Sequence, residues 1–367
     1  MKTDFSSIAN NFNLNAASIN PFGEGHIHET YLVETGKGET SSPPTKASRE
    51  TSFPPRLRGG VGGGTRYILQ KVNTHVFKQP EAVCNNIALV TGWLKKKSIQ
   101  TMEILPAKDG KSWFIDTDGG FWRVFTFIEN SFSIEENATI DDLREAGRGF
   151  GSFLSAFSDF PASRLAETIP GYHDTVKRYA HFHETLQKDP FGRAGEARAE
   201  TDFILQREEY AGKLIRANKA GQIPLRVTHN DTKLNNILFD KDTRKAIAVV
   251  DLDTVMPGLA AIDFGDAIRS GCATAAEDEG NLDKVGVDIE RYQAFKKSWL
   301  SSCGSILNTL EKETLKDGAI IITLEQGLRF LTDYLEGDIY YKISHEKHNL
   351  DRTKNQLKLV AEMEMNL

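Results

Sequence analysis

The sequence predicts an α+β protein of two lobes, a small β-rich N-terminal lobe over residues 1–130 and a larger, mainly helical C-terminal lobe over 131–367. Two patterns lead to this prediction. Before residue 130, short β-branched and aromatic runs alternate with turn signals, which is typical of strands. After it, apolar residues recur at helical spacing over most of the chain. The length of 367 residues is that of about two domains of ordinary size.

Two strands are predicted in the first lobe, at Thr30–Glu34 and Arg66–Val72, because both runs are rich in β-branched and aromatic residues. Glycine, proline, serine and threonine dominate residues 36–65 between them. Such a segment buries too little apolar area to offset the entropy of ordering it, so we expect a disordered insertion loop. Loop-closure entropy grows slowly with length, so the flanking strands can still pair as a hairpin.

The remaining elements are predicted from apolar spacing and turn residues. In chain order they are a helix at Pro80–Lys97, a hairpin of Trp113–Asp116 with Phe121–Val124, a helix at Asp142–Phe157, helices within 173–219, a short β segment within 236–253 and further helices to residue 367.

Composition excludes several classes of function. The net charge of −6 disfavours a general nucleic-acid binder. No apolar run approaches the ~20 residues of a membrane span, and the first residues lack the apolar core of a secretory signal. Three cysteines are too few for a disulfide framework. We therefore expect a reduced, cytoplasmic protein without a membrane partner; the oligomeric state stays open.

Residues with catalytic potential gather between Val227 and Asp253. Asp231 is followed five residues later by Asn236, and an apolar run then ends on Asp251. If the segments flanking the turn at 240–243 pair as a hairpin, Asn236 and Asp251 meet at its open end, with Asp231 in the loop that enters it. Carboxylate and amide oxygens are suitable ligands for Mg²⁺.

Phosphoryl transfer requires such a set of groups, because a metal ion neutralises the triphosphate and an aspartate accepts the proton of the acceptor hydroxyl. The Asp-x₄-Asn spacing, followed by a strand-end aspartate, is that of kinase catalytic loops. The alternative explanation of this segment is a pair of surface turns, which are commonly rich in Asp and Asn. Several fixed positions at once favour catalysis, with Asp231 as base, Asn236 and Asp251 as Mg²⁺ ligands, and ATP as the donor.

The loop resembles that of the aminoglycoside phosphotransferase and choline kinase family, His-Gly-Asp-x₄-Asn, with Asn230 where the family usually has glycine. The resemblance implies a two-lobe protein-kinase-like fold with a nucleotide-binding N-terminal lobe and a catalytic, substrate-binding C-terminal lobe. It extends over nearly the whole chain except 36–65, and is most specific to the bacterial N-acetylhexosamine 1-kinases of that family, in the blocks Phe22–Tyr31, His229–Leu238, Asp251–Gly258 and Leu328–Tyr340.

The resemblance implies ATP- and Mg²⁺-dependent phosphorylation of the anomeric hydroxyl of N-acetylglucosamine or N-acetylgalactosamine, to give the hexosamine 1-phosphate. It also implies that His26, Arg329 and Tyr340 hold the sugar, and that the adenine-binding hinge lies at Phe127, Ile128 and Glu129. The segment Phe264–Arg269 resembles the family's stretch after the metal-binding aspartate, and we expect it to hold the catalytic loop.

Four polar residues near the C-terminus, Arg329, Asp333, Glu336 and Tyr340, are spaced 4, 3 and 4 residues apart. At ~100° per residue this spacing places them on one face of a helix. A solvated charged face is the usual meaning of such a stripe. The resemblance favours a substrate-binding face.

One expected residue is missing. In kinases a strand lysine contacts the α- and β-phosphates. Here that strand position is occupied by Gln70, with Lys71 beside it, and only one of the two can face the nucleotide because strand side chains alternate. The sequence leaves the choice between them open.

Two other functions remain as alternatives. One is another small-molecule kinase of this fold, acting on an amino alcohol, an aminoglycoside or a different sugar. The other is a catalytically inactive, kinase-like sugar-binding module, which the presence of Asp231, Asn236 and Asp251 disfavours. A cationic acceptor would require an acidic pocket, whereas His26 and Arg329 suit a neutral sugar. The preference between the two hexosamines, and among nucleotides, stays open.

We predict that deletion of residues 37–64, closed by a short turn, leaves kinase activity near that of the parent, because a polar, unpatterned loop contributes little to the packed lobe. Turnover and thermal unfolding of the two chains would be compared. A large loss of activity in a shortened chain that still folds would contradict this expectation.

Overall fold

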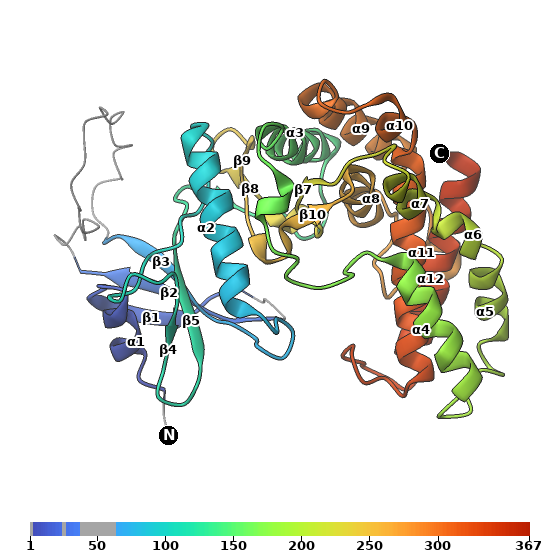
Figure 1. Cartoon of the computed structure of the whole chain (residues 1–367), viewed down its shortest axis with the longest axis horizontal. Helices are drawn as coiled ribbons and strands as arrows, with labels where there is room; N and C mark the ends of the chain where they lie inside the picture. The colour runs from blue at the N-terminus through green and yellow to red at the C-terminus, as the bar shows by residue number, and fades with distance from the viewer. Residues whose placement is uncertain (1–2, 24–26, 37–63) are drawn as a thin grey trace. The chain divides into compact units, whose positions relative to one another are not determined.

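The computed structural model describes residues 3–23, 27–36 and 64–367, which form one unit up to Ser131 and a second from Phe132 to Leu367 (Figure 1). The first is built on an antiparallel sheet and the second is mainly helical, so the predicted α+β fold with two lobes is confirmed. His26 and nearly all of the predicted insertion loop lie outside the described residues. Within the described ranges, no helix has the length and hydropathy needed to span a membrane.

The first unit is organised around a five-stranded antiparallel sheet in the order β1-β2-β3-β5-β4. Its strands are β1 (Ala16–Pro21), β2 (Glu29–Thr35), β3 (Arg66–Lys71), β4 (Phe114–Ile115) and β5 (Phe121–Thr126). The predicted pairing of β2 with β3 and the β4–β5 hairpin are confirmed. The N–H of Thr35 donates to the carbonyl of Thr65 at 3.0 Å, so the two ends of the intervening segment meet.

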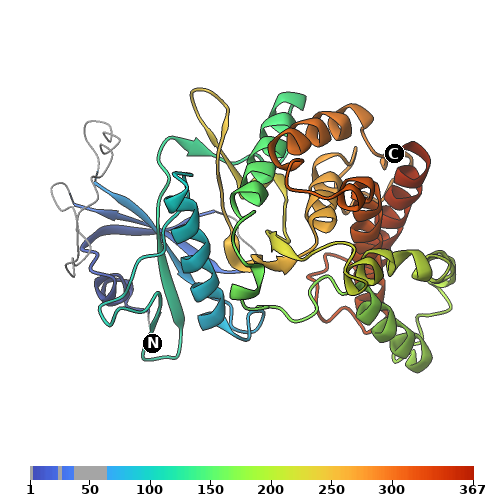
Figure 2. The same cartoon turned by 45° about the horizontal axis from the view of Figure 1, so that its top comes forward.

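Helices cover both faces of this sheet. On one face, α1 (Phe5–Asn11), which the sequence pattern did not predict, packs on a core that includes Leu69, Trp122 and Val124. Figures 1 and 2 show α2 (Pro80–Lys96) on the opposite side of the sheet. Strand side chains alternate, so each residue of β3 and β5 is assigned to one of these two faces by its register.

The second unit contains the predicted helices and several short strands. The helices are α3 (Ile140–Ala156), α4 (Thr175–Lys188), α5 (Arg198–Leu205), α6 (Glu208–Ala211), α7 (Lys213–Lys219), α8 (Ala260–Gly271), α9 (Ile289–Cys303), α10 (Thr309–Glu313), α11 (Leu315–Leu335) and α12 (His348–Asn366); the strands are β6 (Ser131–Phe132), β7 (Arg226–Thr228), β8 (Ile237–Asp240), β9 (Ala246–Val249) and β10 (Met256–Gly258).

The long helix α11 is the centre of this unit and packs against α8, α12 and α4. Its crossing with α8 requires glycine. A Cβ on Gly318 would lie 1.9 Å from the carbonyl oxygen of Ala261, and a Cβ on Gly265 would lie 2.4 Å from the carbonyl carbon of Gly318. The two backbones are therefore in direct contact, and this contact fixes the position of α8.

We predict that Gly318→Ala lowers the free energy of unfolding by about 3 kcal/mol, the upper part of the range for overpacking, because backbone rather than a flexible side chain occupies the space. Urea denaturation would measure the change. Gly280→Ala is the matched control, since its Cβ would meet nothing within 4 Å, and its effect should stay within about 0.5 kcal/mol. Equal effects of the two substitutions would contradict the close crossing.

Candidate active site

The hairpin of β8 and β9 forms as predicted. Ile237 pairs with Val249, and the N–H of Val250 donates to the carbonyl of Asn236 at 2.9 Å. Asn236 and Asp251 therefore lie at the same end of the hairpin. The side-chain amide of Asn236 also donates to the backbone carbonyl of Asp231 at 2.8 Å and lies 3.3 Å from its carboxylate Oδ2. The structure thus brings these three predicted residues to one place.

These oxygen donors suit Mg²⁺. That ion is commonly held by one or two protein ligands together with water and substrate phosphates, rather than by a closed protein cage. The hairpin end offers the carboxylate of Asp251 and the amide oxygen of Asn236, which matches such an open set. Among the residues that the structure describes, no group of three or more His, Cys, Asp or Glu side chains could form a cage.

Asn230, which replaces the usual glycine of the loop, has the left-handed φ of 63° that glycine would adopt freely. Asparagine tolerates this conformation. Its side-chain amide donates to the carbonyl of Thr254 at 2.9 Å, and its Oδ1 accepts from Thr228 at 3.0 Å. A Cβ on Gly258 would lie 2.6 Å from this Oδ1. The asparagine therefore ties the loop to the β7–β10 pair, and Gly258 leaves room for it.

Two buried carboxylates of α8 hold the backbone of the loop. Asp263 accepts the N–H of His229 at 3.0 Å and that of Asn230 at 2.6 Å, and Asp266 accepts the N–H of Thr232 at 2.8 Å. The expectation that 264–269 holds the loop is confirmed for Asp266. Asp263 lies just before that segment and was missed.

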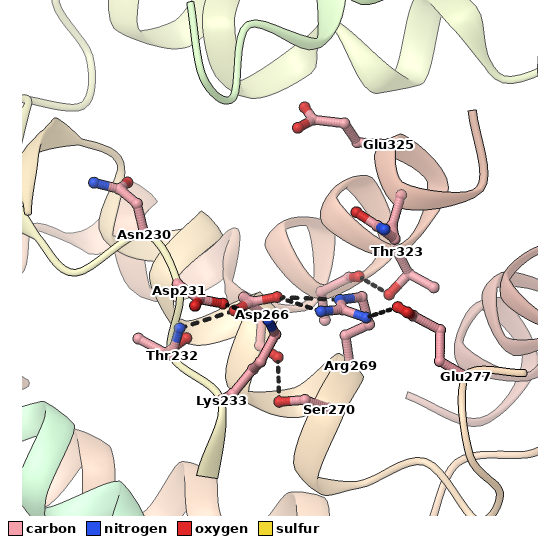
Figure 3. Close-up of polar contacts among 12 residues, drawn as sticks. Asn230, Asp231, Thr232, Lys233, Asp266, Arg269, Ser270, Glu277, Thr323 and Glu325 are labelled. Atoms are coloured by element: carbon pink, nitrogen blue, oxygen red, sulfur yellow. Dashed lines mark hydrogen bonds and ion pairs between the residues drawn. The ribbon is translucent and has the colours of Figure 1, made fainter. Parts of the chain in front are cut away.

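The two carboxylates differ in electrostatic environment. Burial raises the pKa of Asp263, and its charge and hydrogen-bond contacts with His229 act against that rise. Burial would also raise the pKa of Asp266, but the positive charges of Arg269 and Lys233, with the hydrogen bond from Arg269, hold the pKa below the usual range. Figure 3 shows Asp266 between the loop and Arg269, which donates in turn to Glu277 at 2.7 Å. Asp266 therefore stays ionised beneath the loop.

A cation that the sequence analysis missed lies beside Asp231. The ammonium of Lys233 is 3.1 Å from the Asp231 carboxylate, whose side chain is 20% exposed. The negative charge of Asp231 raises the pKa of Lys233, so this side chain remains charged. In the sequence, the position of Lys233 two residues after the predicted base was the feature that could have identified it. The loop thus presents a carboxylate and an ammonium together.

His173 connects the loop to α11. One ring nitrogen lies 3.1 Å from the carbonyl of Asn230 and the other 3.0 Å from the carboxylate of Glu325. Each ring nitrogen therefore lies against an acceptor oxygen, one on the loop and one on α11. Burial opposes ionisation of Glu325, but its contacts with His173, Arg178 and Thr175 lower its pKa to about 2. The pair forms a buried support for the left-handed residue of the loop.

The predicted single helical face of Arg329, Asp333, Glu336 and Tyr340 is wrong. Helix α11 ends at Leu335, and the chain then turns through Gly337 at φ 91° and Asp338 at φ 61°. Tyr340 therefore lies in a loop rather than on the helix. A glycine two residues beyond the last turn is an ordinary stop signal, which the spacing argument ignored.

Asp333 and Glu336 have separate structural partners. The carboxylate of Asp333 accepts the backbone N–H groups of Ile339, Tyr340 and Tyr341 at 3.0, 2.7 and 3.0 Å. It thereby shapes the loop that carries Tyr340. Glu336 instead accepts from Thr185 of α4 at 2.9 Å.

Arg329 and Tyr340 nevertheless lie near each other. The guanidinium carbon of Arg329 is 6.0 Å from the ring of Tyr340 and 5.6 Å from that of Tyr341. Tyr172, which the sequence analysis did not single out, lies within the electrostatic influence of both this group and Asp231. Burial raises the pKa of its hydroxyl, the charge of Asp231 raises it further, and Arg329 opposes the rise. Asp231, Arg329 and Tyr340 therefore share one electrostatic neighbourhood around Tyr172.

In the first unit, the predicted hinge directly follows β5. The guanidinium of Arg66 stacks on the ring of Phe127 at 4.2 Å and donates to Glu129 at 3.1 Å, while Ile128 is buried. The ring of Phe22 meets that of Phe127 edge-on at 5.9 Å. The predicted hinge residues thus form a partly aromatic segment whose exposed carboxylate, Glu129, is paired with Arg66.

Comparison with known proteins agrees with this geometry. The family described as the phosphotransferase enzyme family matches residues 45–295, which is more than half of the chain, so the chain belongs to that family. The prediction of a phosphotransferase from the catalytic loop is thereby confirmed.

Solved structures share the fold at low identity. A microcompartment-associated aminopropanol kinase matches with a TM-score of 0.64 and 16% identity over 98% of this chain and 95% of that chain. An amicoumacin kinase in complex with AMP-PNP, Ca²⁺ and Ami gives 0.63 and 11% over 96% and 92%. A choline kinase from Cryptosporidium parvum gives 0.57 and 14% over 95% and 89%. The predicted kinase-like fold is confirmed.

The low pKa of Glu325 predicts a pH dependence of stability. A carboxyl with a folded pKa of about 2 and an ordinary value of 4.5 contributes stability above pH 4.5 and loses it as the pH falls toward 2. At 1.36 kcal/mol per pKa unit the contribution is about 3 kcal/mol at neutral pH. The stability deficit of Glu325→Gln, measured by urea denaturation, should therefore shrink between pH ~6.5 and ~3.5.

Glu290→Gln, at an exposed glutamate of α9, is the matched control and should show no comparable pH-dependent difference. A deficit of Glu325→Gln that stays constant with pH would contradict the lowered pKa of the Glu325 carboxyl.

Proposed function

We propose that this chain transfers the γ-phosphoryl group of ATP, with Mg²⁺, to the anomeric hydroxyl of an N-acetylhexosamine to give the 1-phosphate. The grouping of Asp231, Lys233 and Asn236 beside Asp251 supports the transfer chemistry most directly. The blocks of sequence that resemble N-acetylhexosamine 1-kinases, together with Arg329 and the tyrosines near Asp231, support the acceptor.

Each group has one role in this proposal. Asp231 accepts the proton of the attacking hydroxyl, and Lys233 stabilises negative charge on the transferred group. Asn236 and Asp251 hold Mg²⁺, which when bound neutralises the triphosphate. The first unit binds the nucleotide, with its base at Phe127–Glu129. Phosphoryl transfer asks little covalent chemistry of the protein, so alignment of these groups accounts for catalysis.

A neutral sugar fits the acceptor side better than an amine. The guanidinium of Arg329 would repel an ammonium group, whereas it can donate hydrogen bonds to hydroxyl and amide oxygens. Tyr172 and Tyr340 offer hydroxyl groups and aromatic faces, which suit a sugar ring. His26, the other predicted sugar contact, lies outside the described residues.

A second candidate is an amine-bearing acceptor, such as an amino alcohol or aminoglycoside. Because the chain shares its fold with an aminopropanol kinase and a choline kinase, amine-bearing acceptors have to be tested beside the sugars. The two candidates use the same transfer groups and differ only in the acceptor, so a panel of acceptors separates them.

We predict that Asp231→Asn lowers kcat with N-acetylglucosamine or N-acetylgalactosamine by ~10²- to 10⁴-fold, the usual contribution of a general base, while sugar binding stays largely intact. ADP release and calorimetric titration of the sugar would measure the two effects. Asp242→Asn, in the exposed turn at the far end of the same hairpin, is the matched control and should retain activity.

Full activity of Asp231→Asn would overturn the assignment of the base. Turnover of the parent with choline or an aminoglycoside, but with neither hexosamine, would keep the phosphotransferase and reject the sugar. Sugar binding without ATP turnover in the parent would instead indicate an inactive binding module.

A further inference from the structure

Tyr340, a proposed acceptor contact, lies in the connection between α11 and α12, residues 336–347. It is 67% exposed, so packing in a core cannot fix its position. The backbone around it is instead held by two carboxylates, those of Asp333 and Asp338. The side-chain amide of Asn349 in α12 donates to both of them at 2.9 Å. The placement of Tyr340 therefore depends on what keeps these two carboxylates in place.

Arg193 is the cation that pairs with Asp338. Its Nη1 donates to the carboxylate of Asp338 at 2.6 Å and to the backbone carbonyl of Tyr334 at 2.8 Å. The side chain of Asp338 is 3% exposed and that of Arg193 is 23% exposed. The guanidinium carbon also lies 4.6 Å from the centre of the Tyr334 ring. One side chain thus connects the last turn of α11 to the first residues of the loop.

The segment that carries Arg193, residues 189–197 between α4 and α5, is itself well fixed. The carboxylate of Asp189 accepts the N–H groups of Arg193 and Ala194 at 2.9 and 3.1 Å. Phe191 of the same segment packs against Gly337, where a Cβ would lie 2.5 Å from the phenylalanine ring. Gly337 has the positive φ of 91° that glycine adopts freely. The segment therefore contacts the start of the acceptor loop at two neighbouring residues.

A second ion pair joins this segment to the end of the loop. The carboxylate of Glu196 accepts from Lys347 at 2.8 Å. These two side chains are 55% and 52% exposed, and ion pairs in water contribute little. Loss of the partner of a buried charge is far more costly. The pair of Arg193 with the buried Asp338 is therefore the main link between the segment and the loop.

We propose that Arg193 is a positioning residue for the acceptor, acting through Asp338 to hold Tyr340 where it binds the sugar. The inference rests on the proposed function, in which Tyr340 contacts the acceptor. Within the part of the chain that the structure describes, Arg193 bonds to its own segment, to α11 and to this loop. Its loss should therefore weaken sugar binding and leave the transfer step intact, which raises KM for the sugar without lowering kcat.

Steady-state kinetics of the full chain with N-acetylglucosamine and N-acetylgalactosamine test this. Arg193→Met should raise KM for the sugar ~10-fold, the lower end expected for lost hydrogen bonds to a charged group, with kcat and KM for ATP changed less than ~2-fold. Arg193→Lys should recover most of the loss, because one nitrogen makes both bonds and an ammonium can supply them. Arg198→Met, at an arginine of α5 that is 86% exposed, is the matched control and should change none of these constants.

A double-mutant cycle with Tyr340→Ala separates positioning from a general structural effect. If Arg193 acts through Tyr340, Arg193→Met should raise KM for the sugar less than ~2-fold further once Tyr340 is replaced. Thermal unfolding would verify that each variant folds. If Arg193→Met does not fold, Asp338→Asn takes its place with the same expected result, because asparagine tolerates the left-handed φ of 61° at this position.

Three results would overturn the assignment of Arg193: an unchanged KM for the sugar in Arg193→Met, a loss of kcat as large as the rise in KM, or fully additive effects in the cycle. An unchanged KM for the sugar in Tyr340→Ala alone would instead overturn Tyr340 as an acceptor contact. A parent chain that turns over neither hexosamine would overturn the proposed acceptor.

Discussion

The candidate active site depends on the hydrogen bonds from the loop backbone to the carboxylates of Asp263 and Asp266. Buried charges are costly unless they are paired or fully hydrogen bonded. Here the loop's N–H groups and the Arg269 guanidinium supply those partners, so the loop conformation and the ionisation of α8 support each other. The close contact between α8 and α11 at Gly265 and Gly318 fixes the position of these two carboxylates. The same helix α11 carries Arg329 and Asp333 of the acceptor side.

On the acceptor side, too, buried carboxylates hold irregular segments of the chain in place. Asp333 gathers three consecutive backbone N–H groups and so shapes the loop that carries Tyr340, while Glu325 supports the catalytic loop through His173. In each case a carboxylate of a rigid helix positions an irregular segment. Such support holds reactive groups in place before the substrate arrives, which is how phosphoryl transfer gains most of its rate.

The sequence predicted elements where the pattern was long or the spacing fixed. Enrichment in β-branched and aromatic residues predicted the strands of the β2–β3 pair, and the Asp231–Asn236–Asp251 spacing predicted the end of the β8–β9 hairpin. The three-residue pair of β7 and β10 is too short to have a periodicity. The predicted helical stripe failed because α11 ends at Leu335 and the chain turns at Gly337, a stop signal that the spacing argument ignored. That Asp333 binds the backbone of the following loop is visible only in the tertiary contacts.

The central claim is that the residues around Asp231 phosphorylate a sugar at its anomeric oxygen. Phosphorus NMR of the product formed from ATP, Mg²⁺ and each N-acetylhexosamine tests it most directly, since coupling of the phosphorus to the sugar protons identifies the esterified carbon. The account predicts a phosphate on C1, absent when Asp231→Asn replaces the parent. A phosphate on another carbon, or a product only from an amine-bearing acceptor, would contradict it.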